Sequence, residues 1–375
     1  MVMGIIRLIL ALEVLIYHLP NNSYFDYIGM NGSIIVNGFF IISGFFIALV
    51  INEKYFKKEG KSYFLFITNR FLKLYPAYFI TLIFAIIVSI IGFLIINNWI
   101  FLQSYFDQNL NIYSLLIFCF ANISMIGINT ISFFSVNPIT GQLFFTGTPE
   151  SNAINFIFIT QAWAVSIELI FYFIAPFILR KKISILVGLL VSSFFLRVLL
   201  YYFGFSDNPW RDRFFPTELV FFMLGAVVYK IYKVYNLKNF INSGNVLLYI
   251  VPLINIAFIF FYQYFPDKTF LYFSIKEWIF YGLLTISLPI MFLLSNNMKK
   301  IDRFTAELSY PIFLSQVVIL NLVAIFINFN VHDNIAKTLT IILTVLFSLI
   351  ITKCLMDPIE KIRQKRIEKT RLDKK

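Results

Sequence analysis

The chain has 375 residues, of which 59% are hydrophobic and only 13% are charged, and its mean hydropathy is +0.81. These values exclude a soluble domain with a polar shell, and the net charge of +12 indicates no nucleic-acid partner because the basic residues form short clusters between apolar runs. The composition predicts an all-α polytopic membrane protein.

Apolar runs long enough to cross a bilayer follow one another along the chain. We expect ten transmembrane helices, at residues 3–19, 33–52, 74–96, 159–179, 183–203, 215–235, 245–264, 273–294, 307–327 and 337–356. The stretch 111–127 is shorter and is interrupted by Asn122 and Ser124, so it is expected as a re-entrant or interfacial segment. The long connection 97–158 around it is either functional or a cap over the helix ends.

The distribution of Lys and Arg predicts the orientation. If both termini are cytoplasmic, the inner connections and the tail hold 23 basic residues and the outer connections hold 5, and cytoplasmic loops carry the positive excess. A full span at 111–127 would place the basic turn 180–182 outside. We therefore expect a membrane domain at 1–356 and a basic cytoplasmic tail at 357–375, most simply a solvated helix end at an anionic membrane surface.

The first predicted helix contains three ionisable residues, Arg7, Glu13 and His18. Such residues are costly at membrane depth and usually face a protein interior or a water-filled pathway. Eleven residues at about 100° each bring Arg7 and His18 to within roughly 20° on one helix face, about 16 Å apart along the axis. Glu13 points elsewhere and is either a buried partner for another helix or a chemical group.

Four stretches stand out in chain order: IRLILALEVLIYHL, VNGFFIISGFFIAL, RFLKLYPAYF and AWAVSIELIFYFIAPFIL. In this order they resemble the acyltransferase 3 family of integral membrane acyltransferases, and RFFPTELVFFMLGAVVY and AELSYPIFLSQ resemble it more weakly. The resemblance runs from residue 5 to about residue 355. It implies a protein that moves acetyl or other acyl groups from acyl-CoA onto sugars and related acceptors.

Within that resemblance His18 and Glu168 are the candidate catalytic residues. Acyl transfer to a hydroxyl needs a base, and neutral histidine suits this near pH 7; otherwise a lone histidine on an apolar helix is a structural group. Glu168, halfway along its span, is expected to orient and stabilise the histidine or to pair with a buried arginine. The structural alternative is an ion pair with Arg197 in the next span.

Arg7, Arg70 and Lys73 are the candidate donor-binding residues. Coenzyme A is a cytosolic polyanion, and guanidinium groups bind phosphates with paired hydrogen bonds. For Arg70 and Lys73 the alternative is ordinary positive-inside flanking. The family often has two arginines three residues apart here, so Lys73 departs from the pattern and would act as a point charge.

Three further positions also depart from the family pattern. Ala164 stands where serine often follows the tryptophan, Gln316 stands where many relatives have histidine, and Asn37 occupies a position that is often acidic. These departures leave open an inactive relative that acts as an assembly partner. A transporter or flippase of a lipid-linked saccharide is the other alternative, because it would have the same hydropathy and buried charges.

The sequence thus predicts an O-acyltransferase of a bacterial inner (plasma) membrane. It would place an acyl group, acetyl by the resemblance, from cytosolic acetyl-CoA or another acyl-CoA on a hydroxyl of a cell-envelope glycan or lipid-linked sugar, either directly or through another protein. Acyl-CoA is a substrate, and no permanently bound cofactor is expected. No metal site is predicted either, because His18 and His332 are the only histidines and no ligand-spaced carboxylate cluster occurs.

Overall fold

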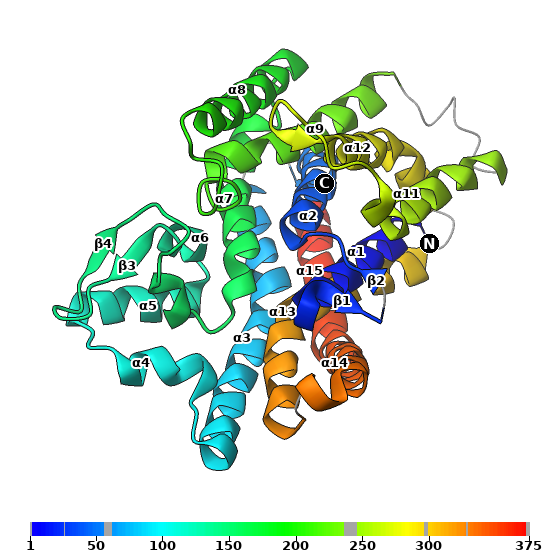
Figure 1. Cartoon of the computed structure of the whole chain (residues 1–375). Coiled ribbons are helices and arrows are strands. Elements are labelled where there is room, and N and C mark those ends of the chain that lie inside the picture. The colour runs from blue at the N-terminus through cyan, green and yellow to red at the C-terminus, as the bar shows by residue number, and fades with distance from the viewer. Residues whose placement is uncertain are drawn as a thin grey trace.

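The computed structural model describes residues 2–25, 27–55, 62–235, 246–295, 299–327 and 329–372, and within these ranges the protein is a bundle of helices (Figure 1). The helices are α1 (Val2–His18), α2 (Gly32–Val50), α3 (Ser62–Ile96), α4 (Gln103–Asp107), α5 (Ile112–Ser124), α6 (Ile128–Ile131), α7 (Trp163–Ile178), α8 (Ile183–Tyr202), α9 (Phe215–Val234), α11 (Ile250–Phe260), α12 (Ile275–Ser295), α13 (Lys299–Phe326), α14 (Phe329–Ile351) and α15 (Asp357–Leu372).

The β-strands of the described residues form three short antiparallel pairs. They are β1 (Ser23–Tyr24) with β2 (Tyr27–Ile28), β3 (Phe134–Val136) with β4 (Leu143–Phe145), and β5 (Thr269–Phe270) with β6 (Phe273–Ser274). In register, Ser23 is opposite Ile28, Ser135 is opposite Phe144, and Thr269 is opposite Ser274. Each pair is a connection between helices, so the fold class is all-α.

Eight helices of the described residues are long and apolar enough to cross a membrane, which confirms the polytopic architecture. They cover Gly32–Tyr55, Tyr63–Ile96, Thr160–Ile178, Ile183–Tyr202, Phe215–Val234, Ile275–Leu294, Lys300–Phe326 and Asp333–Glu368. The other two predicted spans correspond to α1, which has 17 residues, and α11, which has 11. Several helices begin before their apolar run: α3 starts at Ser62, so Arg70 and Lys73 are helical residues rather than loop residues.

The segment 97–158 forms a lobe beside α3 and α7 (Figure 1). Its helix α5 has 13 residues, about 20 Å of helix, which is too short to cross a bilayer. One face of α5 is buried, and Tyr78 of α3 donates a hydrogen bond to the Asn122 carbonyl at 2.6 Å. The opposite face exposes Leu116, Phe120 and Ile123. A short apolar helix therefore lies where the re-entrant or interfacial segment was expected.

Glycines allow two pairs of helices to approach closely. A Cβ on Gly4 of α1 would lie 2.1 Å from the Asp302 carbonyl oxygen of α13, and one on Gly225 of α9 would lie 1.9 Å from the Ile41 carbonyl oxygen of α2. Small residues commonly occupy such helix crossings in membranes because they let the backbones touch. These crossings fix α1, which carries Arg7 and His18, and α2, which packs beside it.

Glu13 fastens the connection between α1 and α2. Its carboxylate accepts a hydrogen bond from the Tyr27 hydroxyl at 2.6 Å and another from the Met30 backbone amide at 3.1 Å. The side chain is only 2% exposed, so both bonds compensate a buried charge. Glu13 is thus a buried structural partner, which was one of the two interpretations, and not a chemical group of the site. Its partners lie in the loop after α1 instead of in another helix.

Replacing Gly225 by alanine should loosen the α2–α9 crossing. The added methyl group meets backbone, which can yield only by separating the helices, and such overpacking costs typically about 1–3 kcal/mol. Thermal unfolding of purified Gly225→Ala in detergent is expected to shift to lower temperature. Gly188→Ala, where a Cβ meets nothing within 4 Å, is the matched control and should be neutral; equal behaviour of the two variants would contradict the close crossing.

The predicted orientation is tested with single cysteines in a background lacking Cys119 and Cys354. Ile139, which is 85% exposed, reports on the 97–158 lobe, and the exposed Lys365 reports on α15. A membrane-impermeant maleimide added to intact cells should label Ile139→Cys but should label Lys365→Cys only after permeabilisation. Labelling of both from the same side would reject the ten-helix orientation.

Candidate active site

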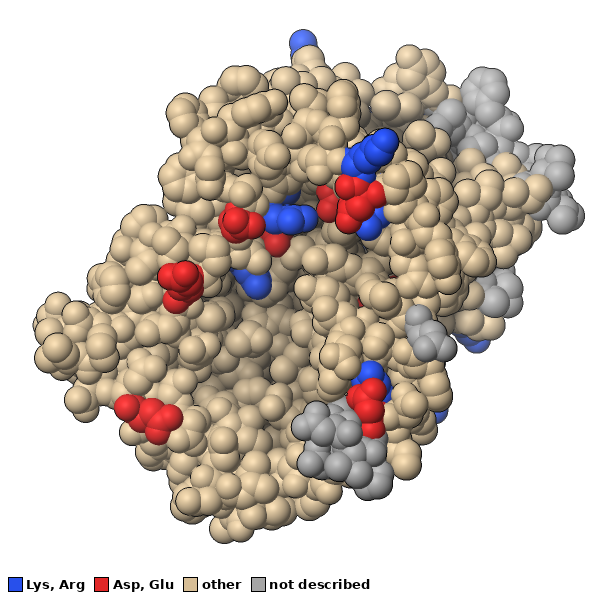
Figure 2. Space-filling model, viewed as in Figure 1, with Lys and Arg blue, Asp and Glu red and all other residues tan. Residues whose placement is uncertain are grey.

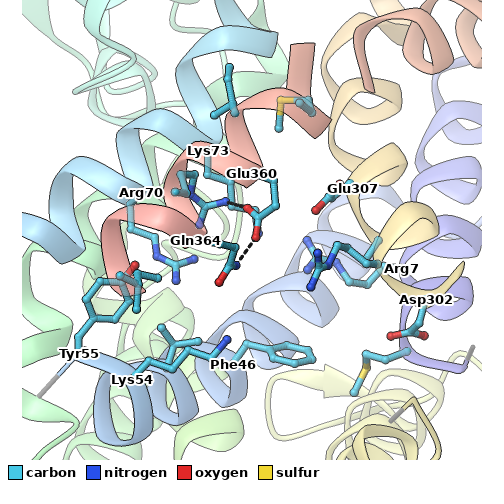
Figure 3. Close-up of a pocket in the computed structure, with 18 of the residues that line it drawn as sticks. Arg7, Phe46, Lys54, Tyr55, Arg70, Lys73, Asp302, Glu307, Glu360 and Gln364 are labelled. Carbon is cyan, nitrogen blue, oxygen red and sulfur yellow. Dashed lines mark hydrogen bonds and ion pairs between the residues drawn. The ribbon is translucent and has the colours of Figure 1, made fainter. Parts of the chain in front are cut away.

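Arg7, Arg70 and Lys73, which are distant in sequence, line one cavity with a volume of about 330 Å³. Arg7 comes from α1, and Arg70 and Lys73 come from successive turns of α3. Figure 3 shows all three side chains around the same space. Positions 70 and 73 are three apart on a helix and therefore share a face. The structure thus brings together the three residues that were predicted to bind the donor.

Basic residues outnumber acidic residues around this cavity. The basic side chains are those of Arg7, Lys54, Arg70, Lys73, Arg303 and Arg363, and the acidic ones are those of Asp302, Glu307 and Glu360. Phosphate groups are favoured in such a cavity, because several positive charges held close together in a partly apolar space attract anions strongly. The cavity is therefore built for a polyanionic ligand.

Arg70 is the most enclosed of the three predicted cations. It is 7% exposed, and its guanidinium lies 5.3 Å from the ring centre of Phe66 and 5.5 Å from that of Tyr172. Cation–π contacts of this kind compensate part of the cost of burying the charge. The Nε atoms of Arg70 and Arg7 are both buried and have no hydrogen-bond partner among the described residues, so each guanidinium keeps a free donor.

A narrower cavity of about 60 Å³ adjoins the first at Arg7, which lines both. Glu168 of α7 faces this second cavity, and its carboxylate accepts hydrogen bonds from the Ser43 hydroxyl of α2 and the Tyr172 hydroxyl of α7. Tyr310 of α13 lines the same space. The negative charge of Glu168 therefore faces the positive charge of Arg7 within the helix bundle.

This arrangement decides between the interpretations of Glu168. Arg197, its suggested structural partner, is paired with Glu218 of α9 instead, and the Arg197 guanidinium also lies over the rings of Phe221 and Tyr272. An Arg197–Glu168 pair is therefore wrong. The reason is topological: α8, which carries Arg197, packs chiefly against α9.

His18 is the last residue of α1 and has partners other than Glu168. Its Nδ1 lies 2.7 Å from the Val14 carbonyl oxygen, and the Gln316 amide nitrogen lies 3.4 Å from the same atom. A carbonyl oxygen only accepts, so Nδ1 carries the proton and Nε2 of the neutral ring has a free lone pair. The expectation that Glu168 orients the histidine is not met, since the backbone of α1 does so.

Arg213 adds a cation on the His18 side that sequence reasoning missed. Its guanidinium lies 3.7 Å from the ring centre of Trp163, its Nη1 is buried without a hydrogen-bond partner among the described residues, and its charge acts on His18. Burial lowers the pKa of Arg213 to about 10, so the group remains charged at neutral pH. The sequence offered only one indication of this residue, the run RDR at 211–213 in the connection between two predicted helices.

A polar cavity of about 510 Å³ lies at the α1–α2 connection, against the end of α1 that carries His18. Its charged side chains form two ion pairs, Arg211 with Glu277 at 3.3 Å and Lys276 with Asp267 at 3.2 Å. Tyr272 also lines it, with a buried hydroxyl that has no partner among the described residues. Figure 2 shows acidic and basic side chains gathered near a hollow between α7 and α12 on an otherwise largely uncharged face.

These sites lie along α1 in a fixed order. The positively charged cavity and the narrow cavity meet at Arg7, and His18 lies eleven residues further along the same continuous helix. A profile of the family described as "Acyltransferase domain" matches residues 3–353. The chain belongs to this acyltransferase family. No curated protein and no solved structure matches it significantly.

The departures of this acyltransferase from the family pattern have structural surroundings of their own. Ala164 lines the narrow cavity beside Glu168, Gln316 lies against His18, and buried Asn37 donates a hydrogen bond to the Tyr281 hydroxyl at 3.0 Å. Each substituted position thus faces the site or the core beside it. The structure provides no titrating group at Ala164 or Gln316, which leaves His18 as the histidine of the site.

Proposed function

We propose that the protein transfers an acyl group from acyl-CoA to a hydroxyl of a cell-envelope glycan or lipid-linked sugar. The observation that carries this proposal is the continuity of the site: a cavity rich in cations meets a narrow cavity at Arg7, on the helix whose other end carries His18. Membership of an acyltransferase family supports the reaction type. The predicted orientation would put the cationic cavity on the cytoplasmic side of the membrane, where acyl-CoA occurs.

The nucleotide of coenzyme A carries its phosphates and fits the larger, cationic cavity. Arg7 and Arg70 would bind phosphate oxygens with paired hydrogen bonds, and Lys73 would contribute a point charge. The pantetheine arm is a long narrow chain, so its thiol end would enter the narrow cavity, where Glu168 and Tyr310 are lining residues. Glu168 acts in this scheme as the counter-charge that positions Arg7 rather than as the partner of His18.

His18 would act as general base on the acceptor. Its Nε2 takes the proton of the acceptor hydroxyl as the oxygen attacks the thioester carbonyl carbon; the C–S bond then breaks, and the thiolate leaves with the proton returned by the imidazolium. Products are an ester and coenzyme A, so atoms and charge balance. Direct transfer needs no covalent enzyme intermediate.

The polar cavity near His18 supports a neutral, hydroxyl-rich acceptor. It presents two cations and two carboxylates as pairs, so it has no excess charge for an ionic ligand, and paired charged groups and tyrosines commonly bind hydroxyls. We place the acceptor at this side of the protein and assign the enzyme to the bacterial inner membrane. Acetyl is the acyl group we would test first.

Removing the donor-side charges should weaken donor binding. Arg7→Gln and Arg70→Gln each lose a charged hydrogen-bond set, which corresponds to roughly 1 to 3 kcal/mol. The dissociation constant of acetyl-CoA, measured by calorimetry on purified protein in nanodiscs, should rise accordingly. Lys181→Gln, in the turn between α7 and α8 and outside these cavities, is the control. Unchanged affinity in both arginine variants, with thermal unfolding intact, would reject the donor site.

Replacing His18 should remove catalysis and spare donor binding. A general base contributes on the order of 100- to 10,000-fold in rate and acts in the transition state. His18→Ala and His18→Gln should therefore bind acetyl-CoA normally but give no acceptor-dependent release of thiol, followed with a thiol reagent on membranes supplied with envelope glycan. Near-normal rates in both variants would show that His18 is not the base. Absence of thiol release in the wild-type protein would favour a transporter.

A further inference from the structure

The basic C-terminal segment is packed against the bundle instead of being solvated as the sequence suggested. Helix α15 lies along α3, where Arg366 donates hydrogen bonds to Thr68 at 2.9 Å and Asn69 at 3.1 Å. Ile367 is 8% exposed. These contacts hold one face of α15 at the edge of the cationic cavity, beside Arg70 of the same α3 helix.

Arg363 of α15 is one of the four arginines that line that cavity. It is 8% exposed, and it donates from Nη1 to the Glu360 carboxylate while its Nε is buried without a partner among the described residues. Gln364 also donates to Glu360, and Figure 3 shows both labelled side chains at the cavity. One carboxylate thus fixes the direction of Arg363 and leaves a charged donor for a ligand.

The arginines of the cavity differ in whether they also line the narrow cavity, since Arg7 lines both and Arg363 lines only the cationic one. The charge of Arg70 acts on both Arg7 and Arg363, and Figure 3 shows Arg7 and Arg70 on opposite sides of the space. Arg7 marks the connection to the narrow cavity, where the thioester end of the donor would lie. Arg363 and the rest of α15 line the cationic cavity and not the narrow one, so Arg363 lies on the side of coenzyme A away from the thiol.

We propose that α15 forms the nucleotide-side wall of the donor site and that Arg363 binds the ribose 3′-phosphate of coenzyme A. This inference rests on the proposed function, since it takes the cationic cavity as the donor site. It makes the C-terminal helix part of the binding site and gives the enzyme a means to distinguish coenzyme A from carriers that lack the 3′-phosphate. A planar guanidinium suits this role because it binds phosphate with two parallel hydrogen bonds.

The test compares coenzyme A with 3′-dephospho-coenzyme A by calorimetry on the full chain in nanodiscs. The wild-type protein should bind coenzyme A about ten- to a hundredfold more tightly. In Arg363→Gln this preference should disappear because affinity for coenzyme A falls to that for the dephospho form, which itself stays unchanged. The exposed Lys365 of the same helix supplies the control: Lys365→Gln removes an equal charge and should keep the full preference.

Arg363→Lys separates charge from helix packing. It keeps the positive charge beside Glu360, so α15 should remain docked, and it should retain only part of the preference because the paired hydrogen bonds are lost. An unchanged preference in Arg363→Gln, an equal loss of affinity for both ligands, or no preference in the wild type would overturn the proposal. If Arg7→Gln and Arg70→Gln still weaken coenzyme A binding in those cases, the proposed function stands; if they do not, the donor site itself fails.

Discussion

The opposite charges of Arg7 and Glu168 inside an apolar bundle are the constraint on which the rest of the site depends. A carboxylate inside an apolar bundle must be compensated, and the half-buried Glu168 receives hydrogen bonds from Ser43 and Tyr172 while facing the cavity that Arg7 lines. Helices α1, α2 and α7 must therefore keep their relative positions. Because Arg7 also lines the larger cavity, the same constraint keeps the two cavities connected.

Charge differs between the cationic cavity and the polar cavity at the α1–α2 connection, and in the proposed function this difference would separate the two substrates. One cavity has six basic and three acidic side chains, whereas the other has two of each, joined in ion pairs. A polyanion is stabilised in the first and gains nothing from the second. Because Arg7 and His18 lie on one helix, their separation is fixed, and in the proposed function it would set the distance between the donor phosphates and the reacting hydroxyl.

Local periodicity made part of the site predictable from the sequence. Arg7 and His18 were placed on one helix face because both lie in a single uninterrupted helix, and the shared face of Arg70 and Lys73 follows from the same rule. The partner of Glu168 was not predictable, since it depends on which helices are neighbours. Hydropathy alone does not show that α8 packs against α9. This packing places Arg197 beside Glu218, with which it forms an ion pair.

The role of α15 was missed for a different reason. Its many charges resemble those of a solvated tail, and charge composition does not reveal that one face is buried. A weak signal was present in the spacing of Met356, Ile359, Arg363 and Ile367, which recur every three or four residues. All four line the cationic cavity. A sparse apolar stripe within a basic segment is thus better evidence for docking than the segment's average hydropathy.

Acidic residues within the cationic cavity have a physical consequence for turnover. A cavity with basic side chains alone would hold a polyanion tightly, and a polyanionic product would leave slowly. Glu360 already occupies Nη1 of Arg363, and Glu307 lines the same space near Lys73. An anionic ligand must share these cations with the carboxylates of the protein. The electrostatic contribution to its binding free energy is therefore reduced both before and after the reaction. If the donor is acyl-CoA, as we propose, the phosphates remain after transfer, so this reduction would apply to substrate and product alike and would favour release at the end of each cycle.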